Sequence, residues 1–202
     1  MGYRTLRGDS EYEFTEKKSR FIGRACYTPT EADAKEFIAL VRAGDPEARH
    51  HVFAYVLGDG TVRMSDDGEP SGTGGAPVLN AVQKNDFKDV TVVVTRYFGG
   101  ILLGAGGLVR ASAKAAVGAL EAAQTTETAE FVEFTGTFRY SKTGAVTYAA
   151  EKHAIPILDR KFADRVVFIL RAEVPTAEQF RESFAEDISV SFAELRREIA
   201  PR

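Results

Sequence analysis

The chain has 202 residues, 44% of them hydrophobic and 27% charged, with a net charge of −3, an ordinary composition for a globular protein of one or two domains. Its single cysteine, Cys26, excludes an intramolecular disulfide and fits a reducing compartment. No apolar stretch reaches the ~18 residues of a membrane span, and the charged N-terminal segment lacks the apolar core of a signal peptide. We therefore expect a cytoplasmic protein without a membrane partner.

The first part of the chain mixes strand and helix patterns. In chain order, its periodicity predicts strands at 11–16 and 20–27, a helix at 31–43, strands at 51–57 and 61–65, a helix at 78–85, a strand at 90–96 and a helix at about 105–123. Thr30 is a good N-cap for the first helix. The segment 124–130 is polar and predicts a linker, so we expect two domains, 1–124 and 131–202.

The second part is compact. The patterns predict a strand at 131–139, a helix at 142–152 capped by Ser141, strands at 155–160 and 165–173, a helix at 177–186 capped by Pro175-Thr176, and a strand at 188–195. This order, βαββαβ, is that of a ferredoxin-like unit. The fold class predicted for the whole chain is α+β.

A glycine-rich segment follows the strand at 90–96. Its glycines are Gly99, Gly100, Gly104, Gly106 and Gly107. Glycine offers positive φ or close approach of another group, so we expect positive φ at Gly100 or Gly106. The loop opens onto a helix start, which favours anions, and Arg110 and Lys114 could cradle a phosphate there. The segment is neither a P-loop nor a GxGxxG fingerprint, and tight helix–strand packing is the alternative.

An acidic turn, 65–70, brings together Asp66, Asp67 and Glu69. Three interpretations stay open: an ordinary solvated turn, a cluster paired with arginine, and a divalent-metal site. Arg96, at the end of a strand, is placed either to pair with this turn or to clamp an anion. We expect the turn 65–72 and the loop 96–107 to line one cleft.

Two further features are ambiguous. His50 and His51 are neighbours on a strand and point to opposite faces, so they cannot easily share a metal. Lys17, Lys18 and Arg20 form a basic patch that is either a solvated hairpin or a nucleic-acid contact. The chain has no GxSxG or CxxC motif, which leaves a covalent mechanism unsupported.

Four blocks resemble the signature segments of the YigZ/IMPACT family: KKSRFI (17–22), ARHHVFAYV (48–56), SDDGEPSGTGGAPVL (65–79) and VVVTRYFGGILLGAGGLVRAS (92–112). The resemblance implies an N-terminal domain like ribosomal protein S5 domain 2, followed by a C-terminal domain like one of elongation factor G. It also implies His50 rather than His51 in the cleft. The chain departs from the pattern at Ala76, where many relatives carry Lys or Arg.

The family's eukaryotic members regulate translation without known catalysis. The resemblance therefore implies a non-catalytic regulatory factor linked to translation, which binds RNA, the ribosome or a translation-associated protein and uses no cofactor or metal; we do not expect DNA as the partner. The alternatives are a nucleotide-dependent small-molecule kinase and a metal-assisted hydrolase. The expected cleft residues are His50, Asp66, Asp67, Glu69, Ser71, Thr73, Arg96, Tyr97, Gly99, Gly100, Gly104, Gly106, Gly107 and Arg110.

Overall fold

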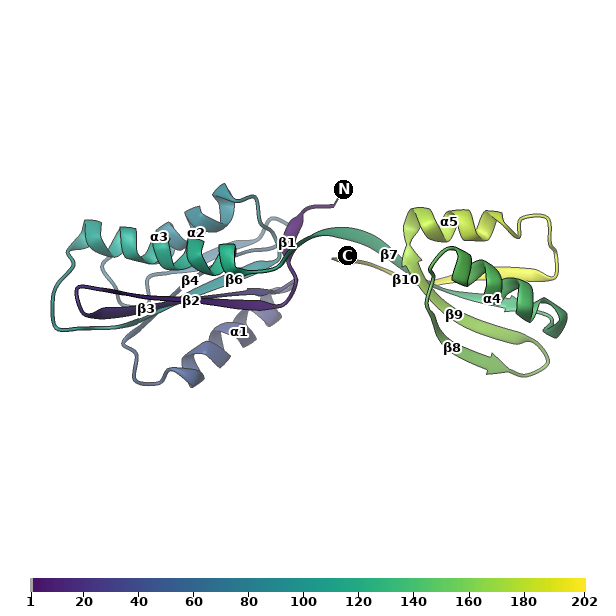
Figure 1. Cartoon of the computed structure of the whole chain (residues 1–202), viewed down its shortest axis with the longest axis horizontal. Helices are drawn as coiled ribbons and strands as arrows, with labels where there is room; N and C mark the ends of the chain where they lie inside the picture. The colour runs from purple at the N-terminus through teal and green to yellow at the C-terminus, as the bar shows by residue number, and fades with distance from the viewer. Residues whose placement is uncertain (1) are drawn as a thin grey trace. The chain divides into compact units, whose positions relative to one another are not determined.

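The computed structural model describes residues 2–202 and has a mixed α+β architecture (Figure 1). The chain divides into two compact units, an N-terminal unit of residues 3–127 and a C-terminal unit of residues 128–200. Among the described residues, no helix is long and apolar enough to cross a bilayer.

The N-terminal unit contains one five-stranded sheet with helices on both faces. Its elements are β1 (Arg4–Leu6), β2 (Asp9–Glu16), β3 (Ser19–Tyr27), α1 (Glu31–Gly44), β4 (His50–Val56), β5 (Val62–Ser65), α2 (Gly75–Lys84), β6 (Val90–Tyr97) and α3 (Ala105–Ala122). The sheet order is β2-β3-β6-β4-β5, and every neighbouring pair is antiparallel.

The two faces of this sheet are covered by different helices. Helices α2 and α3 pack on one face (Figure 1), where Leu108 and Ala115 join Val90, Val92 and Val94 of β6 in the main core. Helix α1 covers the other face through Ala34, Ile38 and Val41. Its predicted cap is confirmed, because the Thr30 side chain accepts the Asp33 N–H and the Asp33 carboxylate accepts that of Thr30.

The C-terminal unit has the element order βαββαβ. It contains most of β7 (Thr125–Phe138), then the 3₁₀ turn Tyr140–Lys142, α4 (Thr143–Lys152), β8 (Ile157–Phe162), β9 (Val166–Glu173), α5 (Val174–Glu182) and β10 (Val190–Pro201). Strand β7 pairs with β9 and with β10, and β9 pairs with β8. Helices α4 and α5 share one aromatic-rich core with the strands, which includes Phe134, Phe168 and Phe180.

The boundary between the two units falls inside the predicted linker 124–130, but this segment is a strand and not a loop. These residues begin β7, in which Thr128 and Ala129 are buried, and residues 125–127 pair with β1, a short strand that the patterns did not indicate. Threonine is β-branched and suits a strand even where the sequence is polar. A polar composition is therefore compatible with pairing to a distant strand.

Three helix boundaries also differ from the prediction. Helix α2 begins at Gly75 rather than 78, because a carboxylate from the acidic turn caps it, as described below. Ser141 does not cap α4, since it lies inside the 3₁₀ turn that precedes the helix. Helix α5 begins at Val174, with proline in its first turn, a position that proline tolerates well.

Candidate functional site

The three carboxylates of the acidic turn have separate partners. Asp66 accepts backbone N–H groups of Gly72 at 2.8 Å and of Gly74 and Gly75 at 2.9 Å, which caps α2. Asp67 accepts Arg42 Nη2 at 2.6 Å and the His51 N–H at 2.7 Å. Arginine side chains and backbone N–H groups thus offset the mutual repulsion of the carboxylates that the sequence places in this turn. No group of His, Cys, Asp and Glu among residues 2–202 is arranged to hold a metal ion.

The third carboxylate, that of Glu69, pairs with Arg96. Arg96 Nη1 donates to Glu69 Oε1 at 2.6 Å, and both side chains are more than nine-tenths buried. The guanidinium also lies 5.5 Å from the ring centroids of Phe21 and Phe98. The predicted pairing of Arg96 with the acidic turn is confirmed for Glu69 only, because Asp66 and Asp67 bond elsewhere. The pair ties the end of β6 to the turn before α2.

The two histidines point to different surroundings, as the strand period predicts. His50 Nδ1 lies 2.8 Å from the Asp67 carbonyl oxygen, and its Nε2 is 4.0 Å from Glu69. His51 Nδ1 lies 3.1 Å from Thr95 Oγ1 in a buried position. Burial lowers the pKa of the His51 imidazole below its usual value, which favours the neutral ring. His50 therefore faces the acidic turn, and His51 is a structural residue of the sheet.

The glycine loop is held against the hairpin that joins β2 to β3. The Gly99 N–H donates to Ser19 Oγ at 3.2 Å, and a Cβ at Gly99 would lie 1.9 Å from the Lys18 carbonyl oxygen. Close approach of two backbones therefore requires glycine here. Gly100 has φ +83°, as predicted, whereas Gly106 lies in α3 without a positive φ. Gly107 packs against Leu103, where an added Cβ would come within 2.9 Å.

The remaining predicted cleft residues lie as follows. Ser71 is exposed, Thr73 is buried and donates to the Pro70 carbonyl oxygen at 2.6 Å, and Tyr97 donates to Asp45 at 2.6 Å. Tyr97 is thus joined to the end of α1, in a network with the ion pair of Arg24 and Asp45. The role of these residues in binding stays a prediction.

The tip of the glycine loop exposes apolar side chains. Phe98 and Ile101 are each 42% exposed, and Leu102 is 80% exposed. Sequence reasoning did not single out Ile101 or Leu102. The sequence could have indicated their exposure, because they lie between glycines, in a segment whose pattern has neither a helical nor a strand period that would assign them to a core.

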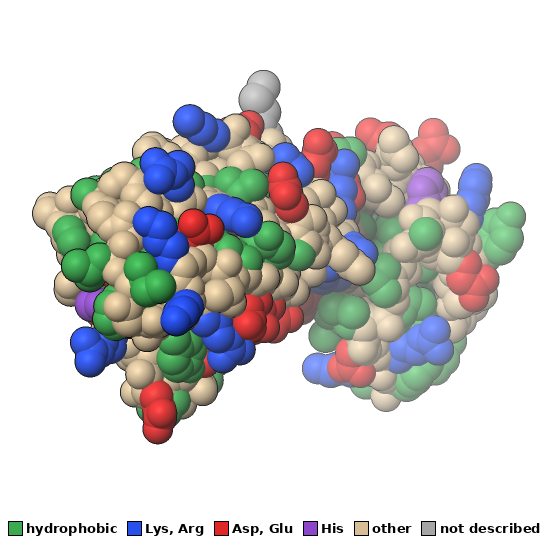
Figure 2. Space-filling model, turned by 60° about the vertical axis from the view of Figure 1, so that its left-hand side comes forward, with side chains coloured by type: hydrophobic (Ala, Val, Ile, Leu, Met, Phe, Trp, Pro, Cys, Tyr) green, Lys and Arg blue, Asp and Glu red, His purple; other side chains and the backbone are tan. Residues whose placement is uncertain are grey.

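Cations without a carboxylate partner surround this loop. Among residues 2–202, no carboxylate lies within ion-pair distance of Lys17, Lys18, Arg110 or Lys114. Lys17 and Lys18 form the hairpin turn at φ 45° and 64°. Figure 2 shows Lys and Arg side chains interspersed with apolar ones on the face of the N-terminal unit turned toward the viewer. Arg20, which the sequence placed in the same patch, is instead held by Glu13 through two 2.7 Å hydrogen bonds.

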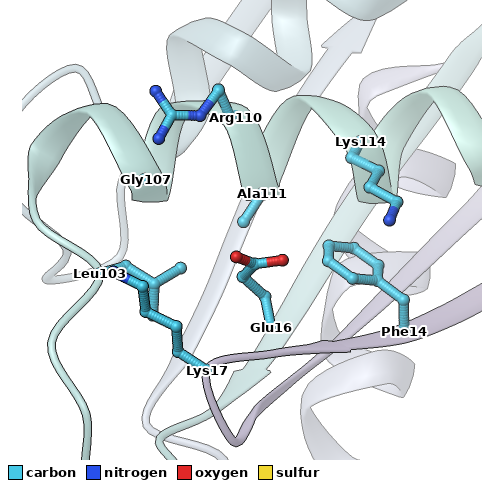
Figure 3. A pocket seen from close by; sticks show the side chains of 8 residues that line it. All are labelled: Phe14, Glu16, Lys17, Leu103, Gly107, Arg110, Ala111 and Lys114. Carbon is cyan, nitrogen blue, oxygen red and sulfur yellow. The ribbon is translucent and has the colours of Figure 1, made fainter.

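A hollow of about 240 Å³ lies between these cations, where the end of β2 faces the first turns of α3 (Figure 3). Its lining consists of Phe14, Glu16, Lys17, Leu103, Gly107, Arg110, Ala111 and Lys114. None of these residues belongs to the acidic turn, so this hollow is not the expected cleft between that turn and the glycine loop. Phe14 and Glu16 carried no signal in the sequence, because only the fold brings β2 beside α3.

The comparisons with known proteins agree on one family. Residues 17–120 match the family described as "Impact N-terminal domain". An "IMPACT family member" of Haemophilus influenzae is 38% identical over 177 residues, 86% of this chain and 86% of that protein. YvyE of Bacillus subtilis and YigZ of Escherichia coli, both described as IMPACT family members, are 47% and 50% identical over 114 and 99 residues. The last two matches cover 52% and 48% of those relatives, about half of each.

A solved structure resembles the whole chain. A crystal structure described as that of "an hypothetical protein" superposes with a TM-score of 0.68 and 29% sequence identity, covering 96% of this chain and 98% of the other. The match therefore extends over the residues of both units, and that protein's description names no activity.

Proposed function

The chain belongs to the IMPACT family, and we propose that it is a non-catalytic, cytoplasmic regulatory factor linked to translation, which binds RNA through its N-terminal unit. In this proposal the N-terminal unit has the fold of ribosomal protein S5 domain 2, and the C-terminal unit is ferredoxin-like. The strand order β10-β7-β9-β8 supports the second assignment, because it places the fourth strand of the βαββαβ unit beside the first. The occurrence of both folds in translation factors is what links the proposal to translation.

The observation that carries the proposal is the set of unpaired cations beside the glycine loop. Carboxylates neutralise Arg20, Arg24, Arg42 and Arg96 of the same unit, whereas three of the unpaired cations line one hollow, namely Lys17, Arg110 and Lys114. In a chain of net charge −3, cations left without such partners create a local positive surface. Phosphate groups of a nucleic-acid backbone are the ligands that such a surface attracts most strongly.

The exposed aromatic side chain of the glycine loop favours RNA as the ligand over a simple anion, which has no base to stack on it. Phe98 lies close to Arg96 at the edge of the glycine loop, and 42% of its surface is exposed. Single-stranded nucleic acid binds to surfaces that combine cations for the backbone with aromatic rings for the bases. Gly99 packs against the hairpin that carries Lys17 and Lys18, so the neighbouring Phe98 offers an aromatic ring beside these cations.

The same geometry favours binding over catalysis at the acidic turn. A kinase or hydrolase would need a carboxylate of this turn as base or metal ligand. Asp66 is committed to the start of α2, Asp67 to Arg42 and Glu69 to Arg96. These contacts hold the glycine loop and the helices in place, which is a structural role.

Salt dependence of RNA binding tests the proposal. Binding of a fluorescent single-stranded RNA to the full chain is measured by anisotropy between low and physiological salt. The variant Lys17→Gln/Lys18→Gln/Arg110→Gln removes three of the unpaired cations. The charge-matched control, Arg49→Gln/Arg63→Gln/Lys84→Gln, removes three exposed cations that have no ion pair among the described residues and do not line the hollow.

For single strands, each phosphate contact contributes about −0.7 to the slope of log affinity against log salt. We expect the first variant to lower the magnitude of the slope by about two and the control to leave it nearly unchanged. Equal slopes for the two variants, or no RNA binding by the wild-type chain at low salt, would contradict the proposal.

A further inference from the structure

The hollow between β2 and α3 has a defined set of charges. Three cations line it, Lys17, Arg110 and Lys114, together with one carboxylate, Glu16, which gives a net charge of +2 (Figure 3). Within the described chain none of the four makes an ion pair, either with each other or with a neighbour. Their charges are therefore available to a ligand.

Packing restrains part of this arrangement. Lys114 Nζ lies 4.3 Å from the centroid of the Phe14 ring, a cation–π contact that holds the ammonium at the wall of the hollow. The Phe14 ring in turn stacks on Phe21 of the core, with centroids 5.4 Å apart. A group held on a packed ring loses less freedom on binding than a free lysine does.

The first turn of α3 lies at the same place. Gly107 lines the hollow, and the first intrahelical hydrogen bond is that from the Leu108 N–H to Gly104. The preceding N–H groups have no partner within the helix. The helix start adds to the attraction of an anion, but the hollow and its cations are what define the site.

We propose that this hollow binds a phosphate monoester that carries hydroxyl groups beside it, either the 5′-phosphorylated end of an RNA strand or a free nucleoside monophosphate. A monoester has a charge of about −1.5 to −2 at neutral pH, which matches the net +2 of the hollow. The Glu16 carboxylate can only accept hydrogen bonds, so it suits sugar hydroxyls and disfavours additional phosphates. The RNA source rests on the function proposed above, whereas the free nucleotide does not.

Two pairs of ligands test the inference on the full chain. One pair is an RNA oligonucleotide with a 5′-phosphate and the same strand with a 5′-hydroxyl. The other is a nucleoside 5′-monophosphate and the nucleoside itself, with inorganic phosphate as the simplest probe. We expect the 5′-phosphate to tighten RNA binding about tenfold, the result of two added charge-assisted contacts.

Variants test where the phosphate binds. At physiological salt, Lys114→Gln should weaken binding of inorganic phosphate about threefold, and Glu16→Gln should strengthen it about threefold, as expected for one unit charge about 6 Å from the phosphate with salt screening. The matched control, Lys84→Gln, removes an exposed lysine that does not line the hollow and should have little effect.

The outcomes separate this inference from the proposed function. RNA binding that ignores the 5′-phosphate, without binding of the monophosphate, overturns the inference and leaves the RNA factor intact. Monophosphate binding that responds to the Lys114 and Glu16 variants, without any RNA binding, supports the site and contradicts the RNA function. Equal losses in the Lys114 and Lys84 variants would overturn the site, because they indicate unspecific charge attraction.

Discussion

Asp66 links the acidic turn to the helix that follows it. Its Oδ1 accepts the N–H groups of Gly74 and Gly75, and its Oδ2 accepts that of Gly72. Burial raises the pKa of the carboxyl, but the three N–H donors lower it by more, so that the pKa of Asp66 lies below its ordinary value. The charged form is therefore part of the folded structure of this segment.

We predict that Asp66→Asn destabilises the protein by about 2 kcal/mol at pH 7, the cost of disrupting charge-assisted hydrogen bonds. Asparagine keeps one acceptor for α2 but turns an amide donor toward the Gly72 N–H. Urea denaturation measures the change. The control Asp59→Asn alters an exposed turn residue whose carboxylate accepts local hydrogen bonds, such as that from the Thr61 N–H, and it should change stability by less than about 0.5 kcal/mol. Equal effects of the two substitutions would refute the capping role.

The same substitution should change how stability depends on pH. Because the folded pKa of Asp66 is below the unfolded value of about 3.9, its stabilisation is complete above that value and is lost as pH falls through the folded pKa. The difference between wild type and Asp66→Asn should therefore shrink as the pH is lowered below about 4. A difference that stays constant in acid would contradict this.

At the residue scale, the sequence showed which charged residues require a partner more clearly than it showed which residue supplies that partner. It showed that three adjacent carboxylates require compensation and that Arg96 could supply it, which holds for Glu69. It could not show that Arg42, on α1, pairs with Asp67, since only the packing of α1 on the sheet brings them together. The opposite orientation of His50 and His51 was predictable, because it follows from the strand period alone.

At the scale of elements, strong periodicity predicted the two longest helices, α1 and α3, well. The predicted helices at 31–43 and about 105–123 correspond to α1 at Glu31–Gly44 and α3 at Ala105–Ala122. Strand β1 and the beginning of β7 were not predicted. They form by pairing with each other, as between Arg4 and Glu127, which lie at the two ends of the sequence of the N-terminal unit. Local patterns carry no information about such long-range pairing.

The start of α3 offers a prediction that separates two glycines of the same loop. Gly104 has φ +73° and ψ 165°, a region that is open essentially to glycine alone, whereas Gly106 lies in the helix with only Arg110 Nη1 near an added Cβ, at 3.5 Å. We expect Gly104→Ala to cost about 1–3 kcal/mol of unfolding free energy. Gly106→Ala should be neutral or stabilise by up to about 1 kcal/mol.

Thermal and urea denaturation of the two variants provide the measurement, with each variant serving as the other's control. If both substitutions destabilised the protein equally, the start of α3 would not depend on the unusual backbone of Gly104. The glycines would then serve close packing throughout, which is the alternative that the sequence left open.

At the scale of the whole molecule, each unit has its own core. The buried clusters of the N-terminal unit join α2 and α3 to one face of its sheet and α1 to the other, and a separate aromatic cluster fills the C-terminal unit. The family match at 17–120 falls within the N-terminal unit. The glycine loop, the unpaired cations and the hollow belong to that unit too, so the proposed function is assigned to it.

The α+β class and the βαββαβ order were predictable at this scale, because they depend on the types and order of elements. The hollow was not, since it forms where Phe14 and Glu16 of β2 meet Arg110 and Lys114 of α3, elements far apart in the sequence. Four motif blocks indicated the family from the sequence alone. The sequence could not show that, within the basic patch, Glu13 engages Arg20.

Mapping RNA contacts by amide NMR on the full chain tests the central claim most directly. On titration with single-stranded RNA at low salt, the account predicts shifted amide signals at Lys17, Lys18, Gly100 and Arg110, with residues 128–200 largely unchanged. The shifts should fade as salt is raised, because the contacts are to phosphates. Shifts confined to residues 128–200, or no shifts at low salt, would contradict the account.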